Sequence, residues 1–133
     1  MTVKILLLYC MIFCHIVDDY YLQGVLAKMK QRKWWDENAP QMMYKYDYVV
    51  ALIMHGFSWS FMIHLPIVIY GIITSNCDMI LSAVIFLPIQ ALAHAYIDNE
   101  KANEMSINLT FDQILHVMQI GFIWLIAIGF FKI

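Results

Sequence analysis

The chain has 133 residues, of which 62% are hydrophobic and only 14% charged, and its formal net charge is −2. Soluble domains average about half apolar and about a quarter charged residues, so the composition excludes an ordinary soluble domain and predicts an integral membrane protein. A net charge so close to zero also gives no reason to expect a nucleic-acid partner.

Four apolar stretches follow one another along the chain, at residues 3–22, 48–73, 79–97 and 109–131. Each is close to the roughly 20 residues that an α-helix needs to cross the hydrocarbon core of a bilayer. We therefore expect one integral membrane domain over residues 1–133. Its predicted fold class is all-α, a four-helix transmembrane bundle.

The first stretch carries His15, Asp18 and Asp19 near its end. These polar residues, together with the lack of a small-residue cleavage site, favour a spanning helix over a signal peptide. His15 and Asp19 are four residues apart and so lie on one helix face, which Gln23 continues. Asp18 is rotated by about 100° from Asp19, and we expect it to face a neighbouring helix or the membrane interface.

The linker over residues 24–47 combines basic with aromatic side chains. Its basic residues are Lys28, Lys30, Arg32, Lys33 and Lys45, and its aromatic residues are Trp34, Trp35, Tyr44 and Tyr46. This combination is typical of a segment that lies at the level of the lipid headgroups. The sequence therefore predicts an interfacial segment in the first linker.

The second stretch contains two histidines, and only one is expected to belong to a site. His55 lies two turns into the predicted helix, whereas His64 follows nine residues later and therefore points to nearly the opposite side. We exclude His64 for this reason. Pro66 lies inside the stretch and is expected to kink the helix, which membrane helices tolerate.

The third stretch repeats the pattern of the first, because His94 and Asp98 are again four residues apart. Gln90 and Lys101 extend the same helix face in opposite directions. Lys101 is expected at the headgroup level, where its ammonium group could hold a phosphate. Pro88 predicts a second kink.

The fourth stretch reverses the order of the pair, with Asp112 four residues before His116 and with Gln119 on the same face. Six basic residues of the linkers 24–47 and 99–108 share one side of the membrane in this topology, and Lys4 and Lys132 take the other. The positive-inside rule then places both linkers in the cytoplasm and both termini outside.

This topology brings polar residues of four helices to a common depth, within roughly 15 Å of the cytoplasmic boundary. Histidine and carboxylate side chains are the usual ligands of zinc, manganese and iron. The expected metal ligands are His15, Asp19, His55, His94, Asp98, Asp112 and His116. Buried charges cost several kcal/mol unless they are neutralised, so we expect one or two divalent ions, with zinc favoured. Interhelical hydrogen bonding without a metal is the alternative.

The order of these motifs resembles a domain-of-unknown-function family of small bacterial and phage membrane proteins. The motifs are H-x-x-x-D-x-x-x-Q (His15, Asp19, Gln23), an isolated His55, H-x-x-x-D-x-x-K (His94, Asp98, Lys101) and D-Q-x-x-H (Asp112, Gln113, His116). The resemblance covers nearly the whole chain. The family itself is similar to membrane-bound metal-dependent hydrolases. The resemblance implies the same site residues and leaves the reaction open. Asp18 and the tryptophans of the first linker depart from the pattern.

The leading hypothesis for function is a membrane-embedded metal-dependent hydrolase that acts on a lipid-linked or amphipathic substrate at the cytoplasmic leaflet. Asp19 or Asp98 would be the general base, and Lys101 would bind the substrate. A metal or proton carrier is the first alternative, although transport sites tend to lie near the midplane. A metal-stapled structural or partner-binding protein is the second alternative, with a homo-oligomer or another membrane protein as possible partner.

Overall fold

The computed structural model describes residues 2–130, and these residues form helices and turns with no β-strand. The elements in chain order are α1 (Val3–Val17), the π-helical turn η1 (Asp18–Leu22), α2 (Leu26–Met29), α3 (Arg32–Asn38), the 3₁₀ turn η2 (Met42–Tyr44), α4 (Asp47–Ile73), α5 (Cys77–Ala102) and α6 (Leu109–Phe130). The end of the fourth predicted stretch, at residue 131, and Lys132 lie outside the described residues.

Four of these helical segments are long and apolar enough to cross a membrane, over Val3–Leu22, Met42–Ile73, Cys77–Ala102 and Leu109–Gly129. The predicted all-α, four-helix architecture is therefore confirmed, and it is consistent with a membrane protein. The third segment continues five residues beyond its predicted end at residue 97, because the polar residues after it stay helical. Pro66 and Pro88 lie within α4 and α5, and both helices continue through them.

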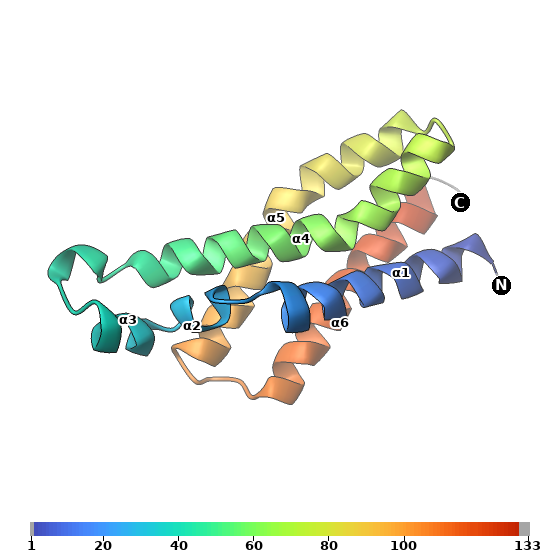
Figure 1. Ribbon diagram of the computed structural model, residues 1–133. Helices are drawn as coiled ribbons and strands as arrows, with labels where there is room; N and C mark the ends of the chain where they lie inside the picture. The colour runs from blue at the N-terminus through green and yellow to red at the C-terminus, as the bar shows by residue number, and fades with distance from the viewer. Residues whose placement is uncertain (1, 131–133) are drawn as a thin grey trace.

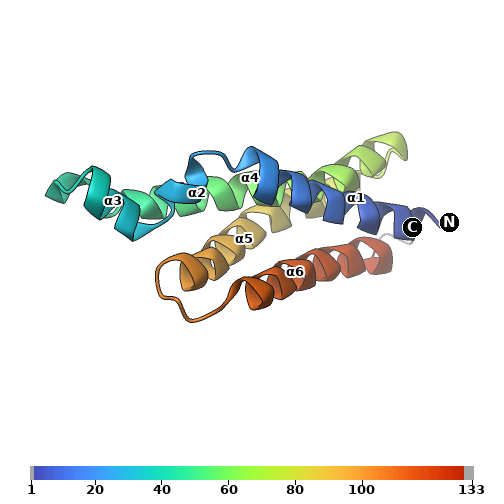
Figure 2. The same ribbon diagram turned by 60° about the horizontal axis from the view of Figure 1, so that its bottom comes forward.

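The long helices run back and forth, so the connections gather at two opposite ends. Figure 1 shows the start of α1, the end of α6 and the α4–α5 turn at one end, and α2, α3 and the α5–α6 connection at the other. Helix α4 packs against both α1 and α5, and α6 contacts α1 and α5. Figure 2 shows the same bundle from a second side, with α6 alongside α5.

The interior is apolar in the half of the bundle that lies toward the α4–α5 turn. Its buried side chains are Met11, Trp59, Ile63, Ile67, Met79, Ala83, Ile120, Ile123 and Ala127. The other half of the interior is polar and contains buried histidines, aspartates and a lysine. Trp59 lies at the boundary, since it belongs to the apolar cluster and its indole stacks on the His94 ring, with centroids 4.1 Å apart.

A close approach of α4 and α5 positions the polar half. Gly56 on α4 faces the backbone of α5, and a Cβ atom at this position would lie only 2.4 Å from the carbonyl oxygen of Ala91. Small residues permit such backbone approaches between membrane helices. Because His55 precedes Gly56, and His94 follows Ala91 by one turn, this contact sets the distance between the two histidines.

The first linker folds back onto the bundle instead of extending from it. Asn103, which caps the end of α5, donates from Nδ2 to the Lys30 carbonyl oxygen at 3.0 Å and accepts from the Arg32 backbone N–H at 2.7 Å. The Trp35 indole N–H donates to the Met29 carbonyl oxygen at 2.6 Å. These bonds hold α2 and α3 at the end of the bundle where the polar interior lies. The position of the linker at a membrane surface stays a prediction.

Candidate metal centre

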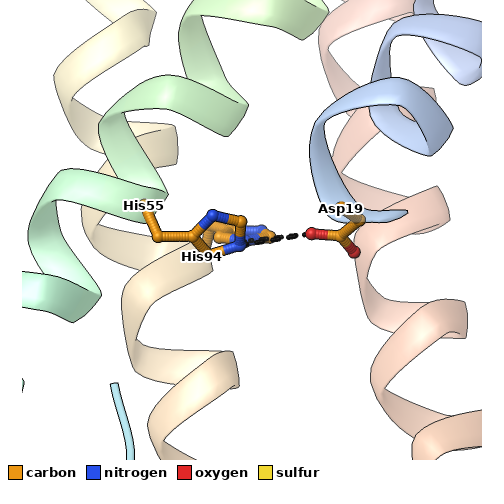
Figure 3. Close-up of side chains that lie close together, drawn as sticks. All are labelled: Asp19, His55 and His94. Carbon is orange, nitrogen blue, oxygen red and sulfur yellow. Dashed lines mark hydrogen bonds and ion pairs between the residues drawn. The ribbon is translucent and has the colours of Figure 1, made fainter. Parts of the chain in front are cut away.

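Two histidines and one aspartate, from three different elements, form the most compact set of possible metal ligands. Asp19 comes from η1, His55 from α4 and His94 from α5, and Figure 3 shows both imidazole rings directed at the Asp19 carboxylate. His55 Nε2 lies 3.1 Å from His94 Nε2 and 3.2 Å from Asp19 Oδ1, and His94 Nε2 lies 4.0 Å from Asp19 Oδ1. We call these three residues the Asp19 group.

These separations suit a small divalent ion. With zinc bonds of about 2.0–2.1 Å, tetrahedral geometry separates neighbouring ligand atoms by about 3.3 Å. Asp98 Oδ2 adds a fourth candidate ligand, at 3.4 Å from His55 Nε2 and 3.7 Å from His94 Nε2. The nitrogen and oxygen atoms of the Asp19 group therefore need only small shifts to surround one ion.

A second set of possible ligands, the His116 group, shares His94 with the first and adds Asp98 and His116. His116 Nε2 lies 3.6 Å from Asp98 Oδ1, and its ring stacks on the His94 ring with centroids 4.2 Å apart. All three residues of this group are buried, whereas Asp19 borders a cavity. Since both groups use His94, they favour one ion and not two.

The ring of His55 is oriented by Asp18 on its far side and by Gln23 on the side that faces the other candidate ligands. Its Nδ1 faces Asp18 Oδ2 at 3.6 Å, and its Nε2 lies 2.9 Å from the amide nitrogen of Gln23, which is a donor. Both contacts favour a proton on Nδ1 and an unprotonated Nε2 that is directed at Asp19 and His94. Asp18 is itself held by the Ser58 hydroxyl, which donates to Oδ1 at 2.6 Å. A carboxylate behind a histidine is the usual support of a metal ligand.

His15 differs from the expectation, because both of its ring nitrogens are bonded to other side chains. The indole N–H of Trp59 donates to His15 Nδ1 at 2.8 Å, so Nε2 carries the proton, and it lies 3.2 Å from Gln113 Oε1. His15 therefore orients Gln113 in this structure. Gln113 in turn directs its amide nitrogen at Asp112 Oδ2, 3.1 Å away, and at Asp19 Oδ2, 3.4 Å away.

Two lysines neutralise two of the buried carboxylates. Lys101 donates to Asp112 Oδ2 at 2.6 Å, and Lys30 donates to Asp98 Oδ2 at 2.6 Å. Lys30 comes from the first linker and is only 6% exposed. Asp112 is thus an ion-pair partner of Lys101 as well as a neighbour of His116, whose Nε2 is 3.3 Å from Asp112 Oδ1.

With neutral histidines and ionised carboxylates, the charges of the polar interior would balance only with a further cation. The interacting charged side chains are Asp18, Asp19, Asp98, Asp112, Lys30 and Lys101. Four carboxylates and two ammonium groups leave a net charge of −2 when the histidines are neutral. Asp18 Oδ2, Asp19 Oδ1, Asp112 Oδ1 and His116 Nε2 are buried atoms without a hydrogen-bond partner among the described residues. One divalent ion supplies the missing charge, so the residues present fit such an ion.

A polar cavity of about 370 Å³ leads to the site from the end of the bundle that carries the linkers. We define the polar cavity by the side chains of Asp19, Gln23, Lys30, Lys101 and Gln113, which line it together with neighbours on η1, α2 and the start of α6. Asp19 is therefore the candidate ligand that incoming water reaches first.

The structure brings Asp19, His55, His94, Asp98 and His116 together with their ligand atoms directed at one another. His15 and Asp112 lie beside them and are engaged by Trp59, Gln113 and Lys101. Asp98 and His55 have comparable partners in Lys30 and Gln23, which an ion would have to displace or share. His64 lies apart from both groups, on the apolar side of Trp59, and its Nδ1 is 2.7 Å from the Ser60 carbonyl oxygen. Gln90 and Gln119 bond to each other at 2.9 Å, and Gln119 also holds His116 Nδ1 at 3.3 Å.

Four residues of the site have no periodic signal of their own in the sequence. Lys30 is one of several linker lysines, Trp59 is one of two tryptophans in the apolar stretches, and Ser58 and Asp18 lie off the expected faces. Gln113 had a signal as part of the D-Q-x-x-H motif. Comparisons with protein-family models, curated proteins and solved structures found no match, so the family resemblance stays a prediction.

Proposed function

We propose that this chain is a membrane-embedded, metal-dependent hydrolase that acts on a lipid-linked or amphipathic ester at the cytoplasmic leaflet of a bacterial inner membrane. The observation that carries this proposal is the Asp19 group beside the polar cavity. Its ligand atoms lie within about 4 Å of one another, Asp19 forms no ion pair with a lysine or arginine among the described residues, and Asp19 borders the polar cavity.

The metal supplies a Lewis acid and lowers the pKa of a bound water to about 7. His55, His94 and Asp19 Oδ1 would hold the ion, and Asp18 orients His55. Asp19 would act as the base through its other oxygen, Oδ2, because Asp98 is tied to Lys30 at 2.6 Å and lies deeper. In the proposed reaction the water oxygen bonds to the ester centre and its proton passes to Asp19. The bond to the leaving oxygen breaks, and that oxygen takes the proton back from Asp19, which regenerates the base.

The apolar half of the core favours hydrolysis over transport. Trp59 and the apolar cluster around it occupy the interior between the site and the opposite end of the bundle. A carrier needs a polar path that continues to the far side. A closed structural site would use the same ligands, but it has no need of a cavity that borders Asp19.

Turnover by the metal-loaded protein tests this proposal. Full-length protein in neutral detergent, loaded with zinc, would be assayed against a panel of phosphate and acyl esters with long alkyl chains. Wild-type protein is expected to release product, and Asp19→Asn with excess zinc is expected to lose turnover while it remains folded. Asp36→Asn, at an exposed position in α3, is the matched control. If wild-type protein fully loaded with zinc releases no product, the hydrolase proposal fails and a structural metal site becomes the better explanation.

A further inference from the structure

A second space adjoins the polar cavity and has a different character. It is a groove of about 510 Å³ between α1 and α6, which we call the α1–α6 groove. Its apolar walls include Ile12 and Ile16 on α1 and Val117 on α6, and it continues along η1. Tyr20 and Gln113 line both the groove and the polar cavity, so the two spaces meet at these residues.

The groove lies on helix faces that have no protein covering them within the described residues. Ile16 is 42% exposed and Val117 is 48% exposed, and both belong to segments long and apolar enough to cross a membrane. In a bilayer such faces contact acyl chains. The groove is therefore a side opening through which a chain can extend from the polar cavity into lipid.

Once a divalent ion offsets the net charge of −2, the polar cavity offers N–H donors to an anionic group beside the ion. Lys30 and Lys101 both line it, and each ammonium group has three N–H donors, of which the bond to Asp98 or Asp112 uses one. A phosphate group offers several acceptor oxygens to such donors and also to a metal ion. A carboxylate offers only two oxygens and a single negative charge.

We infer that the substrate is a single-chain phosphate ester whose phosphoryl head occupies the polar cavity and whose chain lies in the α1–α6 groove. This inference rests on the proposed function, because it names the substrate class of the same site. Gln113 lies at the junction, held by His15 and directed at Asp19 and Asp112. It therefore forms the wall at which the head of the ligand passes into the chain.

Binding of short amphiphiles to the zinc-loaded full chain tests this inference without requiring turnover. Isothermal titration in neutral detergent would compare octyl phosphate with inorganic phosphate and with octanoate. Octyl phosphate is expected to bind at least about 10-fold more tightly than inorganic phosphate, since about two buried methylene groups already contribute that much. Octanoate is expected to bind more weakly than octyl phosphate because its head has one charge.

Filling the groove separates the chain from the head. Val117→Trp is expected to weaken octyl phosphate about 10-fold and to leave inorganic phosphate unchanged. Met118→Trp is the matched control, because Met118 is exposed on the same helix but lies outside the groove lining. Equal affinities of the two tryptophan variants for octyl phosphate would overturn the groove assignment. Octanoate binding as tightly as octyl phosphate would overturn the phosphoryl assignment.

The two proposals can fail separately. If the binding pattern holds but no ester is hydrolysed, the ligand assignment stands and the hydrolase proposal fails. If esters are hydrolysed but Val117→Trp behaves like Met118→Trp in both binding and turnover, the hydrolase proposal stands and the groove assignment fails.

Discussion

Gly56→Ala tests whether the α4–α5 contact sets the geometry of the candidate metal centre. The added methyl group would lie 2.4 Å from the Ala91 carbonyl oxygen and 3.2 Å from the Ala95 Cβ atom. An ordinary contact begins at 3.4 Å, so the two helices must separate locally by about 1 Å. His55 and His94 are anchored next to this contact, and their Nε2 atoms are 3.1 Å apart. A shift of this size would move the two histidine nitrogens, which now lie near the spacing of about 3.3 Å that a tetrahedral ion requires, away from that spacing.

We expect this substitution to weaken zinc binding about 10- to 100-fold, the range seen when the support of a metal ligand is lost. Overpacking should also lower the free energy of unfolding by about 1–3 kcal/mol. Zinc affinity would be measured in detergent by competition with a chromophoric chelator, and stability by thermal unfolding with and without zinc. Gly121→Ala is the matched control, because a Cβ atom at Gly121 has no neighbour within 4 Å. Wild-type zinc affinity in Gly56→Ala would refute the reasoning, as would an equal loss in Gly121→Ala.

Three further outcomes are expected. Elemental analysis should find one divalent metal ion per wild-type chain. The metal content should be small in His94→Ala and unchanged in His64→Ala. Substoichiometric metal in the wild-type protein would contradict the charge balance of the site. Lys30→Met should lower the melting temperature of the metal-free protein, because Asp98 then lacks its cation. Zinc should raise the melting temperature of this variant more than that of the wild type. Lys28→Met, at an exposed position, should change neither quantity. Cys77, which is exposed in the α4–α5 turn region, should react with a membrane-impermeant maleimide on intact cells, and reaction only after lysis would reverse the proposed orientation.

The sequence alone was sufficient to predict the four long helices and the residues that share a face of them, but not the short helices α2 and α3 of the first linker. Apolar length and the four-residue spacing of histidine and aspartate are local properties of a helix, so they can be read without knowing its neighbours. On this basis seven ligands were expected together. The structure groups Asp19, His55, His94, Asp98 and His116 at one end of the bundle, and it engages His15 and Asp112 with other partners beside them. Whether they bind a metal stays a prediction.

Only the tertiary structure decided which partner each polar group meets. Lys30 and Asp98 are separated by 68 residues, and their contact depends on how the first linker folds back and bonds to Asn103. His15 likewise turns toward Trp59 and Gln113, which no spacing within α1 predicts. The physical reason is that helical periodicity determines the face on which a side chain lies. The packing of one helix against another, as at Gly56, determines what that face meets.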